Sequence, residues 1–197
     1  MGKVAFLFAG QGAQHPGMGA GIAAASPAAR AVFEAADSVR PHTFEQCRQG
    51  TKEELSQTEN TQPCVFATDL ACARALEERG VEPDVVAGFS LGEVAALTFS
   101  GAFSDKKGFE LVCRRAELMA AAASAHPGAM RAVVKLDAAR AEELAAEAAR
   151  QTDGDCWPVN YNSPMQTVVA GSPAACAKLD ELVREAGGRA MKVAVSG

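Results

Sequence analysis

Ser90 stands at the centre of Gly88-Phe89-Ser90-Leu91-Gly92, which fits the pattern G-x-S-x-G. This pattern is typical of a nucleophile elbow, a turn from strand to helix so tight that the flanking residues must be small. The apolar residues 85–87 before it indicate a buried strand, and the residues after it favour a helix. The N-terminus of that helix would point free N–H groups at the reacting centre and favour an oxyanion. We therefore predict that Ser90 is a nucleophile.

Two adjacent arginines differ in their helical neighbours. Arg114 has Glu110 four residues before it and Glu117 three residues after it, so its charge is neutralised on its own solvated face. Arg115 has apolar residues at the same offsets, namely Leu111, Val112, Leu118 and Met119. Because a buried unpaired charge is costly, Arg115 must find a carboxylate elsewhere. Two candidates remain open: an Asp or Glu of another element, or a substrate carboxylate held bidentately.

Other residue types that serve in catalysis or metal binding give weaker signals. The histidines, at positions 15, 42 and 126, lie in no context that indicates a general base, although a serine nucleophile needs one beside it. The six cysteines form no CxxC pair, and no zinc-ligand spacing can be assembled. We interpret the cysteines as small buried hydrophobic residues and predict no metal and no cofactor.

A glycine-rich loop, Gly10-Gln11-Gly12-Ala13-Gln14, follows the apolar run 4–8. Two phosphate-loop patterns fail here, because G-x-G-x-x-G requires glycine where the chain has His15, and the P-loop requires lysine where it has Met18. The plain interpretation is a flexible turn from strand to helix.

The elements that must position these residues form two groups. In the first, the apolar runs 4–8 and 85–87 predict strands buried on both faces. One helix is predicted to begin at Ser26-Pro27, a capping box of Thr51 and Glu54 starts a short one, and longer helices are predicted over 63–79 and 105–123. Strands that alternate with helices predict a parallel sheet with helices on its faces.

The second group begins after His126. Strands are predicted over 130–136, 156–161, 167–170 and 189–195, with helices over 138–150 and 173–186. The order βαββαβ is the ferredoxin-like pattern. The sequence therefore predicts an α/β chain with a large subdomain over 1–125 and a small one over 126–195.

Composition bounds the remaining classes of function. The 197 residues are 48% hydrophobic and 22% charged, with a net charge of −5, and no Lys/Arg run forms the basic face that nucleic acid requires. No apolar stretch approaches the roughly 20 residues of a membrane-spanning helix, and no secretory signal is present. We expect a cytoplasmic protein that has neither nucleic acid nor membrane as a partner.

Together these motifs resemble the malonyl-CoA:acyl-carrier-protein transacylase family of fatty acid and polyketide synthesis. The matches run in order along the whole chain: Phe8-x-Gly-Gln-Gly-x-Gln14, Gly88-x-Ser-Leu-Gly-Glu93, Arg115, Gly128-Ala-Met130, Asn160-Tyr-Asn-Ser-Pro164 with Gln166, Ala170-Gly171 and Val195-Ser196. The resemblance implies an α/β-hydrolase-like subdomain, to which the chain returns after residue 195, and a ferredoxin-like subdomain, with the site in a cleft between them.

The resemblance also implies a role for each matching residue. Ser90 would take the acyl group from malonyl-CoA as a covalent ester, and Arg115 would pair with the free carboxylate of malonate. The backbone N–H groups of Gln11 and Leu91 would form the oxyanion hole. The small subdomain would contribute substrate-facing residues, namely Asn160, Asn162 and Gln166. Malonate would then pass to the phosphopantetheine thiol of acyl carrier protein, in a ping-pong scheme.

The chain departs from the family pattern at two places. Phe89 stands where the family most often has histidine, which is not the family's base. The histidine that activates the serine is expected a few residues after Val195-Ser196, but the sequence stops at Gly197. A serine esterase of the α/β-hydrolase type, and an inert fragment that needs a complementing chain, therefore remain alternatives. An unpaired sheet edge and exposed apolar surface would follow, unless another chain covers them.

Overall fold

The computed structural model describes residues 2–193. The chain divides into two compact units, Met1–Ala121 and Ala122–Gly197, and the boundary falls inside one long helix, α7 (Asp105–Ala125). No helix among the described residues is long and apolar enough to span a membrane. The predicted closing motif Val195-Ser196, and the predicted return of the chain to the large subdomain, lie outside the described residues.

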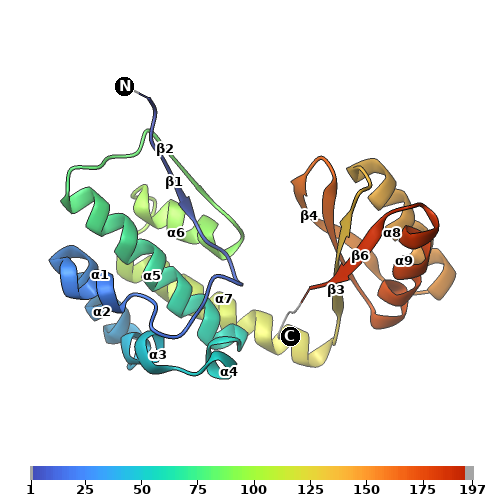
Figure 1. The fold of residues 1–197 in the computed structure, drawn as a ribbon. Helices are drawn as coiled ribbons and strands as arrows, with labels where there is room; N and C mark the ends of the chain where they lie inside the picture. The colour runs from blue at the N-terminus through green and yellow to red at the C-terminus, as the bar shows by residue number, and fades with distance from the viewer. Residues whose placement is uncertain (1, 194–197) are drawn as a thin grey trace. The chain divides into compact units, whose positions relative to one another are not determined.

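The first unit places a short parallel strand pair against helices (Figure 1). Strand β1 (Ala5–Phe8) pairs in parallel with β2 (Val85–Gly88), so that Phe6 lies opposite Val86. The helices of this unit, besides α7, are α1 (Ala20–Ala25), α2 (Pro27–Val39), α3 (Thr43–Gln49), α4 (Lys52–Leu55), α5 (Thr58–Glu78) and α6 (Leu91–Phe99). Phe6 and Phe8 of β1 pack on Phe99 of α6, with ring centroids 5.5 and 5.8 Å apart.

The prediction that both strands are buried on both faces is wrong. Leu7 is 80% exposed and Val85 is 54% exposed, whereas Phe6 and Phe8 are buried. Side chains alternate along a strand, so one face of the pair packs on helices and the other is left uncovered by the described residues. The apolar runs give the strand pair two faces that are suited to burial. The described residues cover only one of these faces.

Local capping signals predicted two helix starts correctly. Helix α2 begins at Pro27, and the Ser26 hydroxyl accepts a hydrogen bond from the Ala29 N–H at 3.0 Å. In the predicted capping box, the Thr51 hydroxyl accepts from the Glu54 N–H and the Glu54 carboxylate from the Thr51 N–H, at 3.2 and 2.8 Å. Both starts are confirmed.

The predicted start of α5 at Pro63 is wrong, because the helix begins at Thr58 and Pro63 lies inside it. A proline there removes one intrahelical hydrogen bond. Residues 61–67 are all buried, so packing outweighs that loss. Helices α1 and α3 were not predicted, because they are short and neither has a side-chain cap at its start.

The second unit has the predicted βαββαβ order: β3 (Ala129–Val134), α8 (Ala138–Thr152), β4 (Cys156–Ser163), β5 (Gln166–Gly171), α9 (Pro173–Glu185) and β6 (Arg189–Lys192). The four strands described in this unit are antiparallel and lie in the order β4-β5-β3-β6 (Figure 1). The core is built from Val133 of β3, Val169 of β5 and the inner faces of α8 and α9. The predicted ferredoxin-like unit and the mixed α/β fold class are confirmed. Strand β3 ends earlier than expected, before Lys135, whose φ of 68° departs from extended backbone.

Candidate active site

Ser90 occupies a strained turn between β2 and α6. Its φ of 56° and ψ of −105° are uncommon for a residue with a side chain. A side-chain carbon at Gly88 would lie 2.1 Å from the Gly92 carbonyl carbon, and one at Gly92 would lie 2.3 Å from the Phe8 carbonyl oxygen. Both positions therefore exclude a side chain. The two glycines of G-x-S-x-G are required because backbone packs directly on backbone here.

The first turn of α6 is capped by its own acidic residue. The Ser90 N–H donates to Glu93 Oε1 at 3.2 Å, and the Glu93 N–H donates to the Ser90 carbonyl at 3.0 Å. Within the described chain, the Leu91 N–H has no hydrogen-bond acceptor. A free N–H at a helix N-terminus, next to the serine hydroxyl, is suited to bind a developing negative charge.

The glycine-rich loop after β1 lies against this turn. The Phe89 N–H donates to the Phe8 carbonyl at 3.1 Å, and a side-chain carbon at Gly10 would lie 2.6 Å from the Phe89 carbonyl oxygen. The Gln11 side chain donates to the Thr58 hydroxyl at 3.3 Å. In the described residues the Gln11 backbone N–H, like that of Leu91, has no acceptor. Phe89 itself is 49% exposed and its ring lies beside Gly10.

Arg115 lies directly against the serine. Its Nη2 donates to Ser90 Oγ at 2.9 Å, and its Nη1 donates to Gln62 Oε1 at 2.6 Å. The guanidinium is half-buried and forms no ion pair with a carboxylate of the described residues. Arg114, by contrast, is exposed and pairs with Glu117 at 3.0 Å. Two partners were left open for Arg115, namely a carboxylate of another element or one of a substrate. The described part of the chain supplies no such carboxylate.

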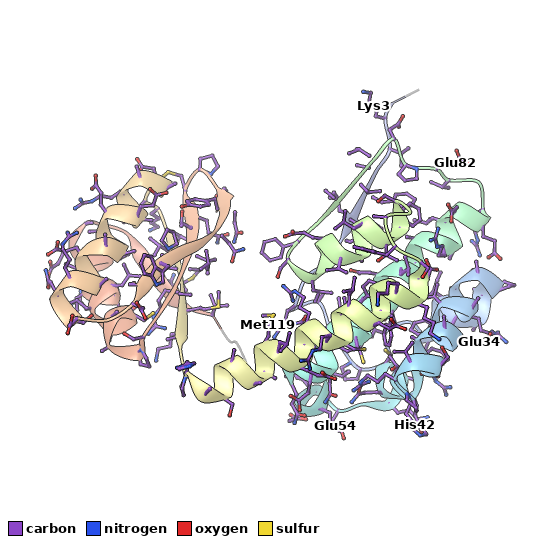
Figure 2. The ribbon with its side chains drawn as sticks, turned by 180° about the vertical axis from the view of Figure 1, so that it is seen from behind. Lys3, Glu34, His42, Glu54, Glu82 and Met119 are labelled. Atoms are coloured by element: carbon purple, nitrogen blue, oxygen red, sulfur yellow. The ribbon has the colours of Figure 1, made fainter. Side chains whose placement is uncertain are left out.

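Gln62 contacts Arg115 but was not predicted as a site residue from the sequence. Its side chain is fully buried on α5, its oxygen accepts from Arg115, and its Nε2 donates to Met119 Sδ at 3.3 Å. Met119 lies on α7, one turn after Arg115 (Figure 2). Gln62 was not predicted because the helix that became α5 was expected to begin one residue later, at Pro63. Its position four residues before buried Phe66, on the apolar side of the helix, is the signal that could have found it.

The histidines take no part in this arrangement. His15 Nδ1 lies 3.1 Å from the Pro16 carbonyl, and His42 Nδ1 lies 3.1 Å from Glu45 on the surface of α3. His126 is exposed. Among the described residues no histidine is hydrogen-bonded to Ser90 Oγ, whose partner is Arg115. The same part of the chain holds no cluster of three His, Cys, Asp or Glu that could bind a metal ion.

The three predicted residues of the small subdomain lie together on the β4–β5 hairpin of the second unit. Asn160 is opposite Val168, and the Asn162 Nδ2 donates to Gln166 Oε1 at 3.3 Å. The register of the two strands shifts on either side of this point. Their role toward a substrate stays a prediction.

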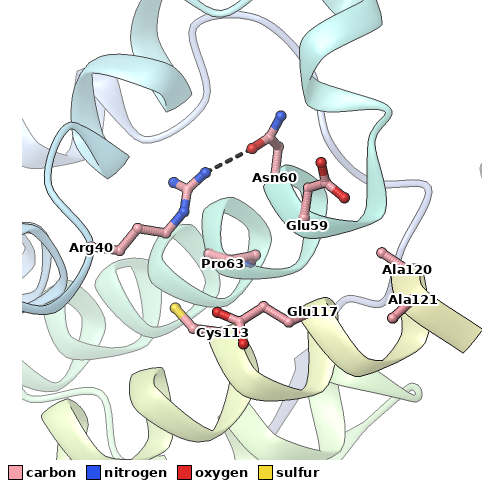
Figure 3. Close-up of a pocket in the computed structure, with 8 residues that line it drawn as sticks. All are labelled: Arg40, Glu59, Asn60, Pro63, Cys113, Glu117, Ala120 and Ala121. Atoms are coloured by element: carbon pink, nitrogen blue, oxygen red, sulfur yellow. Dashed lines mark hydrogen bonds between the residues drawn. The ribbon is translucent and has the colours of Figure 1, made fainter.

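A cavity of about 540 Å³ in the first unit, drawn in Figure 3, does not have Ser90 among its lining residues. Its walls include Cys113 and Glu117, which are two residues before and after Arg115 and so point about 200° away around α7. The Arg40 Nη2 donates to Asn60 Oδ1 across it at 2.7 Å. Burial raises the pKa of the Cys113 thiol to about 11, so this thiol is a poor nucleophile at neutral pH.

These features define a class. The structure has a serine on a strained strand-to-helix turn, with a parallel strand pair beneath it. Two backbone N–H groups, one on the glycine-rich loop and one at the start of α6, have no acceptor among the described residues. These are the features of an α/β protein with a nucleophile elbow. Arg115, which donates to the serine hydroxyl and has no carboxylate partner among the described residues, is an addition that the elbow alone does not require.

Within that class, the chain belongs to the acyl transferase family, because the Acyl transferase domain matches residues 5–196. It is 36% identical over 200 residues to the malonyl CoA-acyl carrier protein transacylase of Bacillus subtilis, an alignment that covers 100% of this chain and 62% of that protein. The chain thus spans less than two thirds of that relative.

The chain is also similar to solved structures of malonyl transacylases. A crystal structure of malonyl CoA-acyl carrier protein transacylase from Clostridium perfringens matches with a TM-score of 0.92 at 36% identity, covering 100% of this chain and 62% of that one. A type II PKS acyl-carrier protein in complex with its malonyl-transacylase matches with a TM-score of 0.90 at 35% identity, covering 99% and 63%. The predicted resemblance is confirmed.

Proposed function

We propose that this chain carries the acyl-transfer site of a malonyl-CoA:acyl-carrier-protein transacylase, with Ser90 as the nucleophile. One observation carries the proposal: the Arg115 guanidinium donates to Ser90 Oγ at 2.9 Å and has no carboxylate partner in the described chain. Malonyl places a carboxylate one methylene away from the thioester carbonyl. An arginine beside the nucleophile is therefore positioned to select a dicarboxylic acyl group over acetyl.

The proposed reaction has two half-reactions that balance. Ser90 Oγ attacks the thioester carbonyl of malonyl-CoA and its proton passes to a general base; the C–S bond then breaks, CoA leaves as the thiol with that proton, and malonate remains as an ester on Ser90. The phosphopantetheine thiol of acyl carrier protein gives its proton to the base and attacks this ester; the bond from the carbonyl carbon to Ser90 Oγ then breaks, the base returns the proton to Oγ, and malonate leaves as a thioester of the carrier. Acyl carrier protein and malonyl-CoA are thus the proposed partners.

The oxyanion of both half-reactions would be held by the N–H groups of Gln11 and Leu91. Support comes from the absence of an acceptor for either group in the described chain, and from the direct contact between the Gly10 and Phe89 backbones. Preorganised donors of this kind contribute about 10²–10³ in rate each.

The general base is proposed to be a histidine outside the 197 residues, as the family resemblance implies. His15 and His42 make other contacts, and the named relatives are longer than this chain. Without a base, the oxyanion hole and binding alone leave a residual acceleration of about 10³–10⁴ over water. We therefore expect slow but measurable acylation of Ser90 by the isolated chain. Asn160, Asn162 and Gln166 are proposed to contact the substrate, and the reaction is proposed to take place in the cytoplasm.

Intact-protein mass spectrometry after incubation with malonyl-CoA tests this function. The chain should gain one malonyl group, and peptide mapping should place it on Ser90. Ser90→Ala should abolish the gain, whereas Ser100→Ala, at the other end of the same helix, should leave it unchanged. A chain that gains no malonyl group, or a Ser90→Ala variant that still gains one, contradicts the proposal.

A further inference from the structure

The turn that begins α6 provides acceptors for all but one of its backbone N–H groups. The Gly92 N–H donates to the Phe89 carbonyl at 3.0 Å, and the Glu93 N–H donates to the Ser90 carbonyl at 3.0 Å. The Ser90 N–H donates to Glu93 Oε1 at 3.2 Å. Among the described residues, only the Leu91 N–H of this turn has no acceptor. The turn therefore presents one donor to a negative charge that develops beside the serine hydroxyl.

One of these acceptors depends on the type of a single side chain. Backbone carbonyls accept from Gly92 and Glu93 whatever the sequence, but the acceptor for the Ser90 N–H is the side chain at position 93. Glu93 is exposed, so packing does not require it. It reaches back from the third helical position to the N-cap residue, which is the contact that Glu or Gln makes in a capping box. The residue at 93 thus decides whether the Ser90 N–H is occupied or free.

The backbone of Ser90 needs such support from outside. Its φ of 56° and ψ of −105° belong to a conformation that persists only where neighbouring contacts enforce it. Arg115 holds the side-chain oxygen at 2.9 Å, and Glu93 holds the N–H of the same residue. The peptide that joins Ser90 to Leu91 carries the free N–H, so the direction of that N–H follows from the ψ of Ser90. Loss of the contact with Glu93 would therefore misdirect the proposed oxyanion donor.

The charge of Glu93 does not assist the proposed reaction. A carboxylate in the first turn stabilises the helix, but it repels an oxyanion that develops nearby. Exposure to solvent screens this repulsion without reversing its sign. What residue 93 contributes to acyl transfer is therefore its acceptor oxygen, which glutamine also possesses.

We propose that Glu93 is a positioning residue for acyl transfer, whose side-chain oxygen fixes the Ser90 backbone and thereby aims the Leu91 N–H at the developing oxyanion. This inference rests on the proposed function and assigns it a side chain that acts only through the backbone of the turn. Because the effect belongs to the transition state, Glu93 governs the rate of acylation at saturating malonyl-CoA rather than the concentration at which saturation is reached.

Glu54 offers a matched control, because it makes the same contact at another helix of the first unit. Its Oε2 accepts from the N–H of Thr51, the N-cap residue of α4, at 2.8 Å, and it is exposed like Glu93. Glu93→Ala and Glu54→Ala therefore each remove the acceptor of an N-cap N–H, but only the first lies beside the nucleophile. Glu93→Gln keeps the acceptor and removes the charge.

The test combines amide hydrogen exchange, followed by NMR, with the malonyl-CoA concentration dependence of Ser90 acylation, followed by intact-protein mass spectrometry. In Glu93→Ala, we expect faster exchange of the Ser90 amide and a maximal acylation rate lower by roughly tenfold or more, with the half-saturating concentration unchanged. Glu93→Gln should keep the slow exchange and acylate at the wild-type rate or faster. Glu54→Ala should alter neither quantity.

Three results would overturn this inference while leaving the proposed function in place. A wild-type maximal rate in Glu93→Ala would reduce Glu93 to a helix cap. A rate in Glu93→Gln as low as that in Glu93→Ala would show that the charge is required and not the acceptor. An equal loss of rate in Glu54→Ala would show that the loss of any helix cap suffices. Absence of acylation in the wild-type chain would instead overturn the proposed function, and this inference with it.

Discussion

Arg115 bridges Gln62 and Ser90, donating to the amide oxygen of one at 2.6 Å and to the hydroxyl of the other at 2.9 Å. Both partners are neutral, so the positive charge beside the nucleophile is uncompensated by the described chain. The buried amide orients the guanidinium without cancelling its charge. An arginine held in this way remains available for a carboxylate that arrives with a substrate.

A carboxylate supplied by the protein itself should therefore neutralise the charge of Arg115 and make it unavailable to a substrate. In Gln62→Glu, the new side chain would form a buried ion pair with the guanidinium, and the rate of Ser90 acylation by malonyl-CoA should fall about tenfold or more. Gln62→Met, which removes the acceptor without adding charge, should lower the rate less. Acylation kinetics by mass spectrometry would measure both, and an undiminished rate in Gln62→Glu would contradict the proposed role of the free charge.

The elbow glycine gives a prediction about stability. Gly92→Ala would bring a side-chain carbon to 2.3 Å from the Phe8 carbonyl oxygen, so β1 and α6 must separate. We expect a loss of about 1–3 kcal/mol in the free energy of unfolding, measured by urea denaturation. Gly21→Ala, in α1 with open space around it, should be neutral or stabilising by up to about 1 kcal/mol. Equal effects of the two substitutions would refute the packing argument.

Burial of the Asp69 side chain, on α5, makes stability depend on pH. Its folded-state pKa of about 7 lies above the roughly 3.9 of an unfolded aspartate, so the folded state binds the proton more tightly. The free-energy cost of burying the ionised Asp69 carboxylate is absent below the unfolded pKa. This cost grows as the pH rises and is complete above about pH 7.

Asp69→Asn should therefore stabilise the chain more at about pH 8 than at about pH 5, by about 1–2 kcal/mol after allowance for partial exposure. Urea unfolding of both proteins at the two pH values measures this, because the other groups cancel in the comparison. A difference between the proteins that stays constant with pH, or shrinks as it rises, would show that Asp69 titrates normally in the folded chain.

Local signals made part of the fold predictable. The elbow was readable because backbone packs on backbone at Gly88 and Gly92, which leaves glycine as the only choice. The capping box at Thr51 and the alternating pattern of the second unit depend on residues that are close in sequence. The contrast between Arg114 and Arg115 followed from helical period alone and matches their different contacts.

Features that depend on tertiary contacts were not predictable in this way. Helix α5 continues through Pro63 because its neighbours are buried, and the early start of that helix is what brings Gln62 to Arg115. The exposure of Leu7 and Val85 was hidden by apolar runs that look the same whether one face or two are covered.

The most direct test of the account is the ratio of Ser90 acylation rates with malonyl-CoA and acetyl-CoA, measured by intact-protein mass spectrometry in the wild-type chain, Arg115→Ala and Arg114→Ala. The ratio cancels any loss of rate that is common to the two thioesters. The wild-type chain and Arg114→Ala should strongly favour malonyl, and Arg115→Ala should lower the ratio by about 10² or more. A wild-type ratio in Arg115→Ala, or equal acylation of the wild-type chain by both thioesters, would contradict the central claim that Arg115 selects the carboxylate.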